Sequence, residues 1–215
     1  MALRFVTAEL VLLLTACVGA SCPPLEQVQK AEVVATYNVS KAQGRFYEVF
    51  VKDVVEAPCT CFLKDRRVTS KSLQDRDQLY CGFGEHRAWY HATEDNYFVT
   101  GQNARFDLVF QSPLIRKVHF PNIILGFAED ATGEYVWLVE YQCMQALGVQ
   151  TYMGFNIYHR RWDPPEADVL AIQKVLEEAG LGEYWGHSIK PMGGPHCNYT
   201  ASPSADEATE TVLVV

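Results

Sequence analysis

The strongest constraint on the fold is a long succession of β-type segments that is followed by a single helical segment. The clearest strand covers residues 104–111, where Ala104, Phe106 and Leu108 alternate with mostly polar residues and so define one face with a period of two. Seven further β-type segments cover residues 44–53, 61–69, 78–92, 97–101, 116–126, 134–143 and 150–160. We find no internal repeat and no linker, so the pattern predicts one all-β domain, an eight-stranded antiparallel up-and-down barrel.

The helical segment follows the last strand. Asp163-Pro164-Pro165-Glu166 has the composition of a helix start, with Asp163 as the N-cap. An apolar stripe with helical spacing then runs from Val169 to Ala179, and Gly180 is a typical C-terminal glycine. We expect this one C-terminal helix to pack on the outside of the barrel.

Residues 1–20 have the features of a signal peptide. Arg4 precedes the apolar run 10–16, and small residues precede a cleavage site at Ser21. This apolar run is shorter than the roughly 20 residues of a membrane span. An alternative is a lipoprotein signal that would place a lipid on Cys17. The ordinary signal is favoured because its removal leaves an even set of cysteines, which indicates up to three disulfides in an exported protein. The set consists of Cys22, Cys59, Cys61, Cys81, Cys143 and Cys197.

The remaining chain divides into a leader at residues 21–43, a barrel domain at residues 44–200 and a disordered acidic tail at residues 201–215. The net charge of −8 disfavours a nucleic-acid partner, because phosphate binding needs clustered Lys and Arg. Asn38 and Asn198 begin N-glycosylation sequons, which fit a secreted glycoprotein. We expect secretion, with an organelle lumen or a lipid anchor as alternatives.

Three motifs in order give the sequence a resemblance to the lipocalin family. Gly44-Arg45-Phe46-Tyr47-Glu48 resembles the first lipocalin motif, although Phe46 stands where the family has Trp. Residues 133–143 resemble the second motif, and Arg160 after Ile157-Tyr158-His159 resembles the third. The resemblance implies a closed barrel in which Phe46 and Arg160 meet at the floor, so Gly44, Phe46 and Arg160 are expected to be structural. Arg161 is the alternative partner if the register slips by one.

Two branches of the family are similar to this chain. The cysteine layout resembles that of apolipoprotein D. This resemblance implies the pairs Cys22–Cys143 and Cys61–Cys197 and leaves Cys59–Cys81, with an exchange of Cys59 and Cys61 as the alternative.

The segment 152–160, the helix and the ending Gly194-Pro195-His196-Cys197 resemble the lipocalin domain of violaxanthin de-epoxidase. That enzyme needs an acidic residue before the second-strand cysteine. The acidic positions of the enzyme fall on Ala57 and Thr60 here, and Glu56 is out of register. We therefore expect a binding protein, with a de-epoxidase-like enzyme as the alternative.

The resemblance also implies a cavity for one small hydrophobic ligand, such as a fatty acid, a sterol, a retinoid or a carotenoid. A barrel filled by its own side chains is the alternative. We expect no cofactor and no metal, because the cysteine spacing does not suit zinc. We further expect a monomer, with peripheral membrane contact as an option, and we place Asp107 and Glu140 on outward rows. The expected ligand-binding residues are Trp89, Phe106, Leu108, Phe110, Tyr135, Trp137, Val139, Tyr141 and Phe155.

Overall fold

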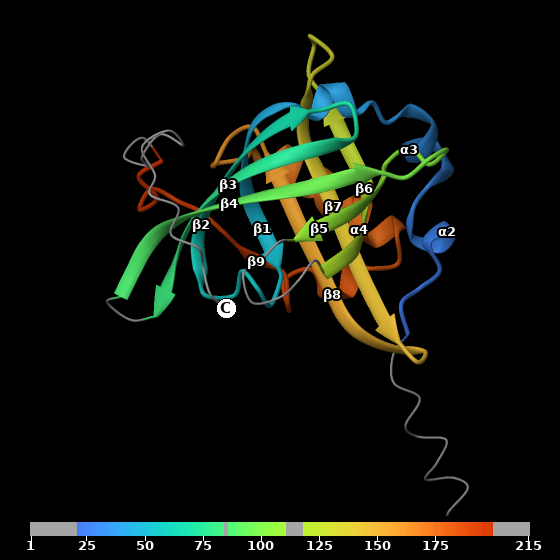
Figure 1. Ribbon diagram of the computed structural model, residues 1–215. Coiled ribbons are helices and arrows are strands. Elements are labelled where there is room, and N and C mark those ends of the chain that lie inside the picture. The colour runs from blue at the N-terminus through green and yellow to red at the C-terminus, as the bar shows by residue number, and fades with distance from the viewer. Residues whose placement is uncertain (1–20, 84–85, 111–117, 200–215) are drawn as a thin grey trace, which may run out of the picture.

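Eight strands close into one antiparallel barrel (Figure 1). The computed structural model describes residues 21–83, 86–110 and 118–199. Each strand pairs with the next, and β1 pairs with both β2 and β8, which confirms the predicted topology. The strands are β1 (Gly44–Lys52), β2 (Cys59–Val68), β3 (Ser72–Phe83), β4 (His86–Phe98), β5 (Arg105–Phe110), β6 (Val118–Glu129), β7 (Tyr135–Ala146), β8 (Val149–His159) and the short β9 (Lys190–Pro191), which pairs with β1.

Two strand boundaries differ from the prediction. The segment expected as one split strand at residues 78–92 forms parts of two long strands, β3 and β4, which pair from Ser72 to Phe83. The short strand expected at residues 97–101 is the end of β4, followed by a turn in which Gly101 has a φ of +73°. Charged residues occur on both faces of these strands, so the alternation of apolar and polar residues that predicts a strand is obscured.

The leader is held against the barrel by a disulfide. It contains α2 (Leu25–Val28), α3 (Ala31–Thr36) and the 3-10 helix η1 (Val39–Ala42). Three disulfides join cysteines within the described residues, Cys22–Cys143, Cys59–Cys81 and Cys61–Cys197, and they are the pairs that the resemblance implied without the exchange. The predicted signal peptide at residues 1–20, with Cys17, and the predicted tail at residues 201–215 lie outside the described residues.

The predicted helix is α4 (Glu166–Glu178), and it packs on the outer face of β6, β7 and β8 (Figure 1). It begins after Pro165 rather than after Asp163, whose carboxylate instead pairs with Arg161. Gly180 ends it with a φ of +71°, as predicted. Buried Ile172 and Leu176 join the wall in the larger apolar core of the molecule. No helix within the described residues is long and apolar enough to cross a membrane.

A second apolar core closes one end of the barrel. Tyr37, from the end of the leader, packs against Tyr135, Phe127 and Phe106, and only 6% of its surface is exposed. Fully buried Phe46 belongs to the same group. This second core extends from the closed end as far as Tyr158, which also lines the interior cavity.

Candidate functional site

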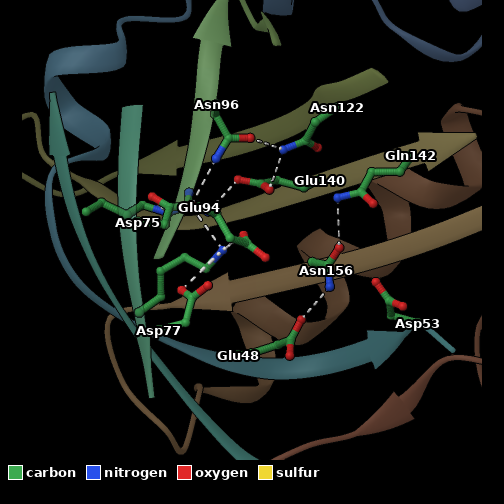
Figure 2. A network of polar contacts seen from close by, with 12 residues as sticks. Glu48, Asp53, Asp75, Asp77, Glu94, Asn96, Asn122, Glu140, Gln142 and Asn156 are labelled. Carbon is green, nitrogen blue, oxygen red and sulfur yellow. Dashed lines mark hydrogen bonds and ion pairs between the residues drawn. The ribbon is translucent and has the colours of Figure 1, made fainter. Parts of the chain in front are cut away.

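The middle of the barrel is lined by polar and charged side chains (Figure 2). On β7, Glu140 and Gln142 point inward, and on β8 Asn156 does so opposite Glu140 in the register. These strands alternate, so their intervening residues face outward to α4. Glu140 is therefore 3% exposed, and its predicted position on a solvated outer row is wrong.

Two cations, Lys64 and Arg66 of β2, lie at the centre of an ionic network. Lys64 Nζ lies 3.0 Å from Asp75, 3.5 Å from Asp77 and 3.2 Å from Glu94. Burial opposes the charge of Lys64, but these carboxylates outweigh it and hold its pKa well above the usual value. These cations of β2 face inward and are neutralised across its pairing with β3.

Arg66 extends the network to the opposite wall. It lies 3.6 Å from Asp75 and 2.6 Å from Glu140. Burial alone would raise the pKa of Glu140, but the charges of Arg66 and Lys64 lower it below its usual range. Asn122 donates one hydrogen bond to Glu140 and one to Asn96, each 2.9 Å long, so these amides fix the orientation of the ionic groups.

A second acidic group, Glu48, Asp53 and Glu56, lies beside this network. Lys64 interacts with Glu48 and Glu56, and Lys52 interacts with Asp53, but burial outweighs both cations. Glu48 is fully buried and accepts a hydrogen bond of 2.9 Å from Asn156. Burial raises the pKa of Glu48 to about 7, and burial together with the neighbouring Glu48 raises the pKa of Glu56 well above its usual value. Asp53 accepts a hydrogen bond of 2.5 Å from the hydroxyl of Tyr152. Burial therefore favours the protonated form of the carboxyl groups in this cluster.

Between the two acidic groups lies a cavity of about 70 Å³. Its wall combines carboxylates and amides with a few apolar side chains. Phe120 and Tyr152 form part of that apolar surface, with ring centres 5.4 Å apart. The lining residues are Asp53, Val55, Glu56, Lys64, Glu94, Asn96, Leu108, Phe120, Asn122, Glu140, Gln142, Tyr152, Asn156 and Tyr158.

Four residues that were expected to bind the ligand lie outside the barrel wall. Trp137, Val139, Tyr141 and Phe155 belong to the apolar core that contains α4, and the expectation that they face the cavity is wrong. The alternation along β7 and β8 was predicted correctly, but the inner face was assigned to the wrong row. The physical reason is that the helix makes the outer face of this wall as apolar as a barrel interior.

The remaining predicted ligand residues are divided among several places. Leu108 lines the cavity. Phe106 and Tyr135 pack at the closed end, so neither lines the cavity. Trp89 and the inward-pointing Glu94 lie on opposite faces of β4. Trp89 contacts the rings of Tyr80 and Tyr199, so its predicted position in the cavity is also wrong. The side chain of Phe110 lies outside the described part of the molecule.

The three residues expected to be structural meet at the closed end. Arg160 Cζ lies 3.7 Å from the centre of the Phe46 ring. Gly44 has a φ of +88°, and a Cβ there would lie 3.0 Å from Arg160 Nη1. Arg161 instead pairs with Asp163 in solvent, so the alternative register does not occur.

Three further features named in the sequence or found in the structure lie away from the cavity: Asp107, the two sequons and a cluster of metal-ligand residue types. Asp107 is half-exposed beside His119, as expected for an outward row. Asn38 and Asn198 are exposed, and their glycosylation stays a prediction. One cluster with metal-ligand residue types occurs among the described residues, at Cys61, His196 and Cys197. Its two sulfur atoms are joined in a disulfide, so they are not free thiolates.

Sequence reasoning missed the whole ionic network. A signal was present: Lys64 and Arg66 alternate on one strand, and Asp75 and Asp77 alternate on the next. The structure pairs Lys64 with Asp77 and Arg66 with Asp75 directly across β2 and β3. Opposite charges at such cross-strand positions stabilise a sheet, and two matched pairs indicate a shared face.

The closed eight-stranded barrel with one outer helix defines the lipocalin fold. No family model matches the sequence, and no curated protein is significantly similar to it. Among solved structures the chain is similar to lobster apocrustacyanin A1, with 12% identity, a TM-score of 0.65 and coverage of 86% of this chain and 94% of that one.

Two further solved structures share the fold. Insecticyanin from the tobacco hornworm Manduca sexta has 12% identity and a TM-score of 0.63, over 87% of this chain and 92% of that one. The cockroach allergen Per a 4 has 15% identity and a TM-score of 0.55, over 75% and 91%. At these identities the similarity establishes the fold alone.

Proposed function

We propose that this protein is a secreted lipocalin that binds one small molecule inside its barrel. The observation that carries the proposal is the cavity between the two acidic groups, because a small closed barrel with an internal space is suited to holding a single ligand. The disulfides and the leader fit an oxidising compartment. Binding rather than catalysis explains a rigid wall in which most polar groups already have fixed partners.

The cavity's size and chemistry favour small polar ligands. A fatty acid, a sterol, a retinoid or a carotenoid has many more atoms than about 70 Å³ can hold, so at most one end of such a molecule fits the cavity without displacing the paired charges of the interior. Four of the predicted apolar residues that would have favoured such cargo belong to the core that contains α4 instead: Trp137, Val139, Tyr141 and Phe155. The similarity to apocrustacyanin and insecticyanin, at 12% identity each, supports the fold alone.

Native mass spectrometry of protein purified from its natural source tests the proposal. We expect one co-purifying molecule per barrel, or a vacant barrel that takes up one small molecule from a chemically diverse set. Heat-denatured protein from the same preparation controls for adsorption. A barrel that binds no member of the set, including oleic acid, retinol and small polar compounds, would leave only the filled-barrel alternative.

One observation favours the enzymatic alternative. Glu56 lines the cavity, and burial beside Glu48 raises the pKa of its carboxyl group well above the usual value, which favours the protonated form that an acid catalyst requires. The carboxylic acid that Ala57 and Thr60 could not supply is therefore present. Incubation with violaxanthin and a two-electron reductant, followed by chromatography of the pigments, tests this function. A loss of epoxide that Glu56→Gln abolishes would support it, and an unchanged pigment would exclude it.

A further inference from the structure

Buried acceptor atoms at and beside the cavity lack a donor from the rest of the protein. Oδ1 of Asn122 has no donor among the described residues, and Oε2 of Glu48 and Oε2 of Glu56 have none apart from a proton that these two carboxyl groups share. Glu56 and Asn122 lie on the cavity wall, and Asn122 is only 2% exposed. An unsatisfied buried acceptor is costly, so each such atom indicates a missing donor.

The orientation of Asn122 is fixed by its neighbours. Its amino group donates to Asn96 Oδ1 and to Glu140 Oε2, both of which are acceptors. A flipped amide would place its oxygen against those two acceptors, so the free atom is the carbonyl oxygen. This observation is independent of the carboxyl cluster, and it points to the same kind of ligand group, a hydrogen-bond donor.

The charges around the cavity indicate which kind of hydrogen-bond donor the ligand carries. Lys64 and Arg66 are already neutralised by Asp75, Asp77, Glu94 and Glu140. Glu48 and Glu56 interact directly with each other, so one shared proton or one external cation must lie between them. A cationic donor would satisfy both oxygens at once, whereas an anion would be repelled.

The volume and the lining of the cavity distinguish a metal ion from a small organic cation. A cavity of about 70 Å³ admits roughly five to seven non-hydrogen atoms, taking about 10–15 Å³ for each water-sized group. Leu108, Phe120 and Tyr152 give the same cavity an apolar and aromatic surface. A bare divalent metal ion would make no use of that surface, while the body of an organic cation would contact it and gain from the ring faces.

We propose that the cavity binds a small protonated primary amine, whose ammonium group lies at Glu56, the partner of Glu48, and whose short body contacts Phe120 and Tyr152. This inference rests on the proposed function and names its ligand class. Binding replaces the proton that the two carboxyl groups share, so uptake of the amine releases a proton to solvent. Charge is conserved at the site, because one positive charge enters as one leaves.

Isothermal titration calorimetry with a matched series tests the class. Butylammonium, 1-butanol and butyrate have nearly the same size but differ in charge. At pH 7 we expect only butylammonium to bind, with heats that change between buffers of different ionisation enthalpy because a proton is released. Tighter binding of butanol or butyrate, or displacement of butylammonium by calcium at equal concentration, would overturn the assignment.

Variants locate the site. Glu56→Gln should weaken butylammonium binding about 10- to 100-fold, the range for loss of a charge-assisted hydrogen bond. Asp107→Asn, which removes a half-exposed carboxylate from the outside of β5, should leave the affinity unchanged. If Glu56→Gln does not fold, Glu48→Gln serves as the second variant, with circular dichroism as the check. Equal affinity in a folded Gln variant and the parent would refute the site.

The two proposals fail in different ways. If oleic acid, retinol or a neutral compound binds in the barrel and butylammonium does not, the binding function stands and the amine assignment is wrong. If no compound of any class binds, the proposed function itself is wrong.

Discussion

Arg160 lies over the ring of Phe46, with its Cζ 3.7 Å from the ring centre. Its nitrogens also donate hydrogen bonds to the backbone oxygens of Tyr135, Arg45 and Gln43, at 2.9, 2.9 and 2.7 Å. One side chain thus joins β7, β1 and the end of the leader. The contact closes one end of the barrel. Neither residue lines the cavity, so we expect neither to take part in selecting the ligand.

Replacing Arg160 by Ala should destabilise the fold. The stacking and the charge-assisted hydrogen bonds would be lost together, and we expect the free energy of unfolding to fall by about 2–4 kcal/mol. Urea denaturation measures the change. Arg45→Ala is the matched control, because the Arg45 side chain is exposed and its pair with Asp65 contributes about 1 kcal/mol or less. A change in cavity affinity without a loss of stability would contradict the structural role.

Gly44→Ala should be costly for two separable reasons. A φ of +88° strains any residue with a Cβ by roughly 1–2 kcal/mol, and the new atom would press on Arg160. Gly101→Ala is the control, since Gly101 has a φ of +73° with open space around it. The extra cost at Gly44 should disappear in an Arg160→Ala background, and a double-mutant cycle followed by thermal unfolding measures this coupling. Equal costs in both backgrounds would show that the contact with Arg160 has no effect.

Removing the central cation should be more damaging than removing a surface one. Lys64→Gln would leave buried Asp77 and Glu94 without a cation and Asp75 with Arg66 alone, and we expect a loss of about 3–5 kcal/mol in the free energy of unfolding. Lys174→Gln, which removes a pair on the exposed face of α4, should cost about 0.5 kcal/mol. Chemical denaturation compares the two, and similar values would show that the interior is not an ionic network.

Glu48 should make the protein less stable as the pH rises. In the folded state burial raises its pKa to about 7, while the unfolded chain loses the same proton near pH 4.5. Between these values the folded state holds the proton and the unfolded state does not, so stability falls by up to about 3 kcal/mol from pH 4.5 to 7 and then levels off. The ionisable groups that interact with Glu48 are Asp53, Glu56, Lys64, Tyr158 and Tyr199.

Urea denaturation at a series of pH values measures this effect. Glu48→Gln should flatten the dependence between pH 5 and 7, because the amide carries no titrating proton. Asp107→Asn controls for a general change in acidity. An identical slope in the parent and in Glu48→Gln would assign the pH dependence to another group.

Local sequence signals were sufficient for the order of the elements. Alternation in β5 and β7, the Gly180 stop and the three motifs lie within single segments, so neighbouring residues reveal them. The disulfide pairs followed from the resemblance. These features gave the correct barrel, the outer helix and the contact between Phe46 and Arg160.

The inner surface required information that one strand does not contain. β7 has large apolar residues at Trp137 and Val139 and also at Leu138 between them, so its pattern does not show which row meets the helix. The position of Lys64 opposite Asp77 depends on the register between two strands whose charged pattern had left β3 partly unrecognised. Glu56 reaches the cavity from the loop between β1 and β2, where linear alignment placed it out of register.

The apolar core between α4 and the barrel wall has a consequence for how the interior can change. Ile172, Leu176 and the outer rows of β7 and β8 hold the helix without contributing to the cavity wall. Acids and bases in the interior could therefore be exchanged in compensated pairs while this outer layer stays intact. The ligand specificity of this scaffold can therefore change through substitutions of inward-facing residues alone, while the core between the barrel wall and α4 is kept.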